Sequence, residues 1–182
     1  MEIEWGNSQM ETYKREMPSP ERILLEQIFR KGTWPAFTYK WARKGLCTPE
    51  LKDAFHLLWI ERGHFIRSRL KNDRKLLKVL RALLPAYEGE GLWLYRGENL
   101  DTYRSGKLGF CWTTDENVAI GFARGFNNFG SGGILVKAWA PASSILAGMH
   151  PHSENWLREK EITVDWFSIE KLAVIQEFKS NE

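Results

Sequence analysis

The chain has few cysteines, which limits what can hold its fold together. Only two occur among 182 residues, Cys47 and Cys111, in segments that we expect to differ in structure. Small secreted domains that depend on disulfides carry many more, so no disulfide framework is indicated and a reducing compartment is the default. At this length the chain can bury a core of its own as one compact unit.

Long apolar runs are also missing. The start of the chain, residues 1–5, does not combine a basic segment with an apolar stretch, and no run approaches the roughly 18 apolar residues of a membrane span. We therefore expect no membrane partner and a cytoplasmic location where the protein is made. A protein that a dedicated machine delivers into a host cell would share these features, so action in another cell stays open.

Basic and acidic residues nearly balance. The net charge is +3, and residues 1–90 hold 17 basic and 12 acidic residues where residues 91–182 hold 9 and 11. The basic excess of the first half suits an acidic partner or nucleic acid, but a solvated helical face explains it as well. His150 and His152 are too isolated to indicate a metal site, and no metal is expected.

What the sequence does contain is a helical first half. Residues 1–20 form a polar, proline-ended leader, and residues 21–87 are predicted to form a helical lobe. Apolar residues recur at helical spacing over residues 21–30, 49–70 and 73–84. Ser19, Thr48 and Asn72 are candidate N-caps, and Gly32 is the expected end of the first helix.

Short apolar runs replace the helical spacing in residues 88–182. The predicted strands cover residues 91–97, 110–113, 133–140, 143–147, 161–164 and 172–178. One helix is predicted over residues 115–126, with Val118, Ala119, Phe122 and Phe126 on one face. Helices followed by strands indicate an α+β protein whose β-rich part, residues 88–182, packs with the helical lobe as one unit.

Charged side chains stand at the ends of two predicted strands, where they would project into a cleft. Arg96 followed by Gly97 places a fixed cation beside backbone that a phosphate can approach closely. Glu159 and Glu161 alternate, so along a strand both would face the same side. Two such carboxylates can share the work of breaking a glycosidic bond. Taken singly, an ion pair is the better explanation of the arginine, and an exposed edge strand is the better explanation of the glutamates.

Together these segments resemble the mono-ADP-ribosyltransferases of the arginine-serine-glutamate class, which split NAD at the nicotinamide–ribose bond. Arg96-Gly97 matches the family's Arg-Gly, residues 109–115 resemble its serine motif, and Glu159-Lys160-Glu161 matches its Glu-x-Glu. The resemblance covers roughly residues 91–178. It implies a split β-sheet core of the ADP-ribosyltransferase type, with the helical lobe beside the NAD cleft.

The resemblance also implies roles for the matching residues. Arg96 would hold the phosphates of NAD, and the backbone of Gly97 would bind the nicotinamide carboxamide. Thr113 would supply the hydroxyl that braces Glu161, the glutamate that stabilises the oxocarbenium-like ribose as nicotinamide leaves. Glu159 would orient or deprotonate the attacking group, as is typical of members that modify arginine.

The serine motif departs from the family's usual pattern. Cys111 stands where serine is most common, and Thr114 offers a second register beside Trp112 and Thr113. All four residues are expected to contribute to the NAD site, and the source of the functional hydroxyl stays open. No histidine stands near Cys111 in sequence, so we expect a small buried substitute rather than a nucleophile.

Two loop aromatics complete the predicted site. Phe129, in the glycine-bearing stretch 127–133, would cover the nicotinamide ring or only anchor its loop. Trp156, in the loop 150–158, would be the exposed anchor of the segment that reads the acceptor, or it would pack against the sheet.

The resulting hypothesis is an NAD-dependent transferase that moves ADP-ribose onto a macromolecule, with NAD as donor substrate. A protein arginine is the leading acceptor, and nucleic acid is the other class considered. The small size, without a separate delivery domain, points to a bacterial or phage-encoded effector or toxin. Two alternatives are an NAD glycohydrolase on the same fold and a non-catalytic binding module that uses the basic helices.

Overall fold

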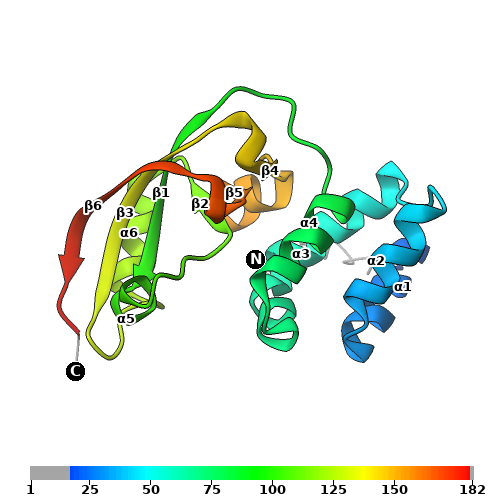
Figure 1. Ribbon diagram of the computed structural model, residues 1–182, viewed down its shortest axis with the longest axis horizontal. Helices are drawn as coiled ribbons and strands as arrows, with labels where there is room; N and C mark the ends of the chain where they lie inside the picture. Colours follow the sequence, from blue (N-terminus) through cyan, green and yellow to red (C-terminus); the bar gives the residue numbers. More distant parts are fainter. Residues whose placement is uncertain (1–16, 181–182) are drawn as a thin grey trace, which may run out of the picture.

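The computed structural model describes residues 17–180, which form a helical lobe beside an antiparallel sheet (Figure 1). Mixed helix and antiparallel sheet confirm the predicted α+β class. Most of the expected leader, residues 1–20, lies outside the described residues. Within the described part of the chain, no helix is long and apolar enough to cross a membrane.

Four helices make up the lobe, and the predicted caps are in place. They are α1 (Pro20–Lys31), α2 (Trp34–Arg43), α3 (Pro49–Leu70) and α4 (Asp73–Leu83). The side chains of Ser19, Thr48 and Asn72 accept hydrogen bonds from backbone N–H groups in the first turns of α1, α3 and α4. Helix α2 was not predicted, because its buried face is built from aromatic residues over a short length.

A kink in α3 shapes the side of the lobe that faces the sheet. Arg62 has non-helical backbone angles, φ −140° and ψ 15°, inside the helix. The indole of Trp59 lies over Gly63, the residue after Arg62, and a Cβ on Gly63 would come within 2.9–3.1 Å of the ring. The kink and the missing side chain let the bulky indole fill the space between α3 and the sheet.

The sheet has six antiparallel strands in the order β4-β5-β2-β1-β3-β6. They are β1 (Leu92–Asn99), β2 (Cys111–Thr113), β3 (Gly133–Ala140), β4 (Ile145–Ala147), β5 (Glu161–Val164) and β6 (Glu170–Phe178). Among the described residues, β1 and β2 pair only at Tyr95 and Thr113, whereas β1 and β3 pair along their whole length. The sheet therefore consists of two three-stranded halves that separate beyond this single pair.

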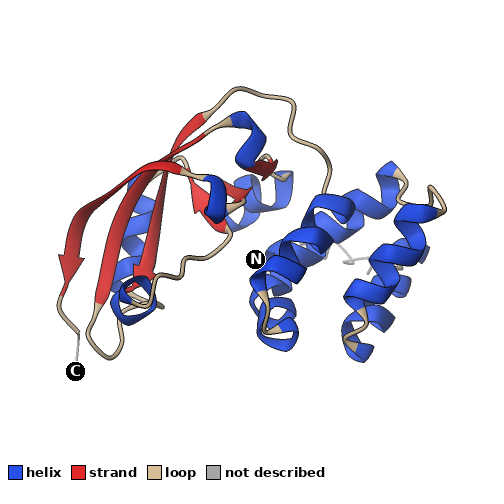
Figure 2. Cartoon of the chain, viewed as in Figure 1, coloured by secondary structure: helices blue, strands red, loops and turns tan. Residues whose placement is uncertain are grey.

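Helix α6 (Glu116–Arg124) packs closely on the half that contains β1 (Figure 2). A Cβ on Gly97 would collide with the carbonyl of Ala119 and the amide of Ala123 in this helix. Gly97 is thus needed for close packing of α6 on β1. The shorter helix α5 (Leu100–Arg104) follows β1 directly, with Asn99 as its N-cap.

Strand β5 has its predicted bounds, but the predicted alternation of Glu159 with Glu161 and the predicted start of β4 are wrong. Strand β5 begins at Glu161, and left-handed backbone at Arg158 (φ 58°) and Lys160 (φ 48°) turns the chain just before it. Glu159 therefore does not alternate with Glu161 along one strand. Residues 142–144 form a 3₁₀ turn rather than the start of a strand.

Strand β1 and helix α6 also differ from their predicted ends. Strand β1 continues to Asn99, so Arg96 lies inside the strand and not at its end. Helix α6 ends at Arg124 with Gly125 as its C-cap, which leaves Phe126 outside the helix and 87% exposed instead of on its buried face.

The two lobes share a core and polar contacts. Phe110, Leu146 and Ala147 of the β-rich part belong to the same buried cluster as the apolar side chains of α1 to α4. The indole N–H of Trp59 donates to Thr163 Oγ1 at 3.1 Å, and Arg81 Nη2 donates to Asp165 Oδ2 at 2.8 Å. These contacts fix α3 and α4 to the strand that carries Glu161.

Candidate active site

A cavity of about 630 Å³ lies where the two halves of the sheet separate, with α3 on one side and α6 on another. Its lining combines apolar rings with six ionisable side chains, those of His64, Tyr95, Arg96, Cys111, Glu159 and Glu161. The lining residues are Trp59, Ile60, Gly63, His64, Tyr95, Arg96, Gly97, Cys111, Trp112, Thr113, Val118, Phe122, Phe126, Asn127, Glu159 and Glu161. The structure thus brings together most of the residues that the sequence singled out.

Glu161 is the most unusual group in this cavity. Its side chain is 9% exposed, and its Oε1 atom has no hydrogen-bond partner within residues 17–180. Its pKa is raised from 4.5 to about 7. Burial is the main cause and the charge of Glu159 adds to it, whereas the Cys111 thiol and the charge of Arg96 act in the opposite direction. A buried carboxylate left unsatisfied beside a cavity is costly unless a ligand completes it.

Ser153 holds the segment that carries both glutamates. Its buried hydroxyl accepts a hydrogen bond from the Glu161 amide at 2.9 Å, and its carbonyl accepts one from the Glu159 amide at 3.0 Å. Sequence reasoning missed this residue, because an isolated serine in a predicted loop carries no signal of such a role. The two contacts explain how Glu159 and Glu161 reach one cavity without sharing a strand.

Glu159 is half-buried at the cavity, and burial raises its pKa above the ordinary value. The next residue, Lys160, forms an ion pair with Asp115 at 3.0 Å. This pair connects the Glu159 segment to the start of α6, where the Asp115 carboxylate also accepts from the Asn117 amide. The position of Glu159 is therefore coupled to the N-cap of α6.

Thr113 lies on the same face of the sheet as Glu161. It is the cross-strand partner of Tyr95 on β1 and of Glu161 on β5, and directly opposite residues point to the same face. Its Oγ1 accepts a hydrogen bond from the Asp115 amide at 3.1 Å. Thr114 is exposed and is not among the lining residues, so Thr113 supplies the cavity hydroxyl of this motif.

Cys111 contributes both its backbone and its thiol. Its carbonyl accepts a hydrogen bond from Arg96 Nη1, and the interaction of its thiol with the Glu161 carboxylate lowers the pKa of Glu161. Burial, followed by the charge of Glu161, raises the thiol pKa well above its ordinary value. The thiol is therefore neutral and a poor nucleophile, although Cys111 is only partly buried.

Trp112 packs in the core of the sheet, where its indole N–H donates to the Gly109 carbonyl at 3.0 Å.

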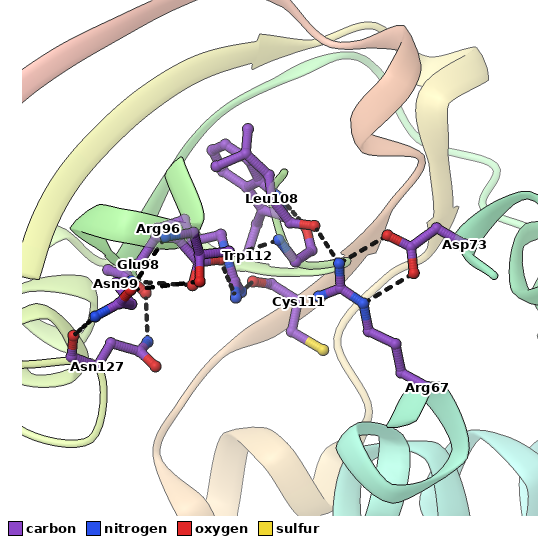
Figure 3. A network of polar contacts seen from close by, with 12 residues as sticks. Arg67, Asp73, Arg96, Glu98, Asn99, Leu108, Cys111, Trp112 and Asn127 are labelled. Carbon is purple, nitrogen blue, oxygen red and sulfur yellow. Dashed lines mark hydrogen bonds and ion pairs between the residues drawn. The ribbon is translucent and has the colours of Figure 1, made fainter. Parts of the chain in front are cut away.

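Arg96 is held in place by Glu98, a buried carboxylate of the same strand. Glu98 Oε2 lies 2.7 Å from Arg96 Nη2 and 2.8 Å from Nε, and it also accepts from the Gly109 amide at 3.1 Å. A Cβ on Gly109 would collide with the guanidinium. Figure 3 shows Arg96 on one side of the segment that runs from Leu108 to Cys111, with Arg67 of α3 on the other.

This pairing matches the ion-pair interpretation of Arg96, and the residue lines the cavity as well. An arginine has five N–H donors. Three of the nitrogens of Arg96 each use one, so one N–H on each Nη is left for an anionic ligand. Gly97 lines the cavity beside it, and its carbonyl accepts a hydrogen bond from Asn127 Nδ2 at 2.8 Å.

The helical lobe supplies a complete wall that carried no recognisable motif. Trp59, Ile60, Gly63 and His64 of α3 line the cavity opposite the strands. Phe126 lies at the cavity with 87% of its surface exposed. These contributions depend on tertiary contacts and could not be read from local sequence.

The two predicted loop aromatics do not line the cavity. Phe129 forms a β-bridge with Gly132, and its carbonyl accepts from Asn99 Nδ2 at 2.8 Å. It therefore anchors its loop, and Phe126 occupies the lining instead. Trp156 is 75% exposed in the turn Ser153–Leu157, as an exposed anchor should be.

No group of three or more His, Cys, Asp or Glu side chains in the described part of the chain could hold a metal ion. A scan against protein-family models and searches of curated proteins and of solved structures found no match to the chain.

Proposed function

We propose that the protein is an NAD-dependent ADP-ribosyltransferase that transfers ADP-ribose to a macromolecular acceptor. The observation that carries this proposal is the cavity in which Glu161, with its unpartnered Oε1, meets Arg96, Thr113 and Glu159. These residues come from the three motifs that resemble the arginine-serine-glutamate class. Their meeting in one cavity is the geometry that this chemistry requires.

The cavity suits NAD as donor substrate in size and in chemistry. Its volume of about 630 Å³ falls within the ~300–1,000 Å³ typical of small-molecule sites. Aromatic side chains in the lining would contact the flat nicotinamide ring, and the remaining N–H donors of Arg96 would bind phosphate. Glu161 Oε1 would accept a hydrogen bond from a ribose hydroxyl.

Glu161 would act on the ribose carbon that bears nicotinamide. As an anion it stabilises the positive charge that develops there while the bond to nicotinamide breaks and the bonding electron pair leaves with nicotinamide. The backbone of Glu161 would be kept in position for this step by its pairing with Thr113 across the strands and by its amide hydrogen bond to Ser153. An acceptor atom then bonds to the same carbon, and Glu159 takes its proton.

Two alternatives differ in the fate of bound NAD. In an NAD glycohydrolase, water would take the place of the acceptor; the second carboxylate, Glu159, favours transfer, because it would activate an incoming nucleophile. In a non-catalytic module, Arg96 and Glu161 would need no cavity between them. A role as a bacterial or phage effector that acts in a host cell rests on the sequence alone.

The test incubates the purified protein with NAD labelled in the adenylate part and a cell lysate. Nicotinamide release and label on protein and nucleic acid are followed together, with Glu161→Gln as the control. Label that requires Glu161 supports the transferase, and release without label supports the glycohydrolase. Absence of both signals, together with absence of NAD binding by calorimetry, would reject the enzyme.

A further inference from the structure

A second cavity, of about 670 Å³, lies between the junction of α3 and α4 and the β-rich part. We call it the basic groove. Its lining residues are His64, Arg67, Ser68, Lys71, Asn72, Asp73, Arg74, Lys107, Trp166 and Phe167. His64 also lines the candidate active site, so the two cavities are adjacent.

The charges of the basic groove are unbalanced. Its single carboxylate, Asp73, is fully used by Arg67, which donates to both of its oxygens at 2.9 and 2.7 Å (Figure 3). Within residues 17–180, Lys71, Arg74 and Lys107 form no ion pair with a carboxylate. All three are exposed, and they come from the end of α3, the start of α4 and the loop before β2. Three separated cations favour a ligand with several anionic groups over a single phosphate.

We propose that the basic groove binds the phosphate backbone of a single-stranded nucleic acid. Lys71, Arg74 and Lys107 would each contact a phosphate. The stacked rings of Trp166 and Phe167, with ring centroids 3.9 Å apart, support the groove. The Cζ atom of Arg74 lies 3.7 Å from the centroid of the Phe167 ring. This packing holds the Arg74 guanidinium at a fixed place in the groove.

The shared residue His64 connects the groove to the catalytic carboxylate. A strand held in the groove would place a neighbouring unpaired base in the aromatic-lined cavity beside Glu161. Bases inside a duplex are not accessible in this way, which favours a single strand. An arginine-bearing protein segment would be repelled by the groove, so its charge points away from the arginine acceptor implied by the resemblance.

The role of the bound strand as acceptor rests on the proposed function, whereas its binding does not. In the transfer, a base nitrogen forms a bond to the ribose carbon, the bond from that carbon to nicotinamide breaks, and nicotinamide leaves with the electron pair. The proton of the base nitrogen passes to Glu159. The products are ADP-ribosylated nucleic acid, nicotinamide and a proton.

The first measurement is fluorescence anisotropy with labelled single-stranded RNA and DNA of about 12 nucleotides. The groove variant K71Q/R74Q/K107Q is compared with K31Q/K40Q/K44Q, which removes the same charge from exposed positions of α1, α2 and the C-cap of α2. The groove variant should bind the oligonucleotides at least about tenfold more weakly than the wild type. The slope of log affinity against log salt should become less steep by about 2. The distal variant should bind like the wild type.

Other outcomes overturn the inference. Equal weakening in both triple variants would mean that net charge alone attracts the strand. If poly-glutamate displaced the labelled oligonucleotide as well as an unlabelled oligonucleotide does, phosphate would not be what the groove recognises. Loss of NAD affinity in the groove variant, measured by calorimetry, would assign the groove to NAD. Failure of the proposed function is separate, since wild-type protein would then bind the oligonucleotide without releasing nicotinamide from NAD.

Discussion

At the scale of single residues, the site depends on the protonation state of Glu161. Burial and the neighbouring Glu159 oppose ionisation, whereas the Cys111 thiol and Arg96 favour it. The balance leaves the pKa at about 7, where small changes in the surroundings alter the fraction ionised. A residue that must be anionic to stabilise a developing cation is therefore sensitive to pH near neutrality.

For the proposed transferase, the rate of nicotinamide release is expected to rise with pH from about 6 to 8, because the proposed mechanism requires the ionised form of Glu161. Its midpoint should lie near the Glu161 pKa of about 7. In Glu159→Gln the like charge is gone, so the midpoint should move to lower pH even though the maximal rate falls. Initial rates, each normalised to the plateau of the same protein, measure both midpoints. A midpoint that stays in place after the substitution would contradict the assigned coupling.

The same pKa predicts how stability depends on pH. Between 4.5 and about 7 the folded protein holds a proton on Glu161 that the unfolded chain releases, so stability falls as pH rises through this range. The difference corresponds to about 3 kcal/mol. Glu161→Gln removes this pH-dependent loss of stability. The difference in unfolding free energy between the variant and the wild type should therefore be larger at pH 8 than at pH 5, in favour of the variant. Urea unfolding of both proteins at the two pH values checks it; a difference independent of pH would show that the carboxylate is not destabilised by burial.

Sequence reasoning found the side chains with distinctive chemistry and missed those that position them. Arg96, Thr113 and Glu161 stand in short motifs and all line the cavity. Ser153 and Glu98 hold two of them, but each is an ordinary polar residue whose role depends on contacts across the fold. Thr113 and Thr114 could not be distinguished from sequence, because the choice depends on which of them is paired with Glu161 across two strands.

At the scale of secondary-structure elements, the long uniform segments were predicted best. Helices α3 and α4 carry regular apolar spacing and side-chain caps, so local sequence determines their starts. Strand β5 was placed correctly at residues 161–164, but the turn before it was not, because left-handed backbone at Arg158 and Lys160 has no signal in those residue types. That turn is what separates the two glutamates in structure.

The segment before β2 is expected to control the position of Arg96. Gly109→Ala would place a methyl group against the guanidinium, which Glu98 and the Cys111 carbonyl already hold on its other sides. The guanidinium must move, and NAD affinity measured by calorimetry should fall at least about tenfold, or about 1.4 kcal/mol. Gly121→Ala is the matched control, because a Cβ there meets no atom within 4 Å. Unchanged NAD affinity in Gly109→Ala would mean that the position of Arg96 does not contribute to NAD binding.

At the scale of the whole molecule, the candidate site exists because two differently built parts meet. The strands and their turns supply Arg96, Thr113 and both glutamates, whereas α3 closes the cavity with an aromatic wall. The basic groove lies along the same junction. The sequence predicted a helical lobe beside a β-rich core. It did not show which helix face packs on the core, because Trp59 and His64 look like ordinary helix residues.

The contact between Trp59 and Thr163 should couple this junction to the site, since Thr163 stands two residues beyond Glu161 on the same strand. Both side chains are buried, so Trp59→Phe leaves the Thr163 hydroxyl unpaired and Thr163→Val leaves the indole N–H unpaired. Each should cost about 1–3 kcal/mol of unfolding free energy, and the double variant should cost less than their sum.

Trp34→Phe is a matched control for the indole, because Trp34 is equally buried and its Nε1 has no partner within the described residues. It removes the same atoms without breaking a hydrogen bond, so its loss of unfolding free energy in urea should be smaller than that of Trp59→Phe. Additive losses for Trp59→Phe and Thr163→Val would mean that packing, and not this hydrogen bond, connects α3 to β5. A coupled loss would show that the helical lobe and the strand bearing Glu161 are stabilised as one unit, so a change in the lobe would alter the site without touching it.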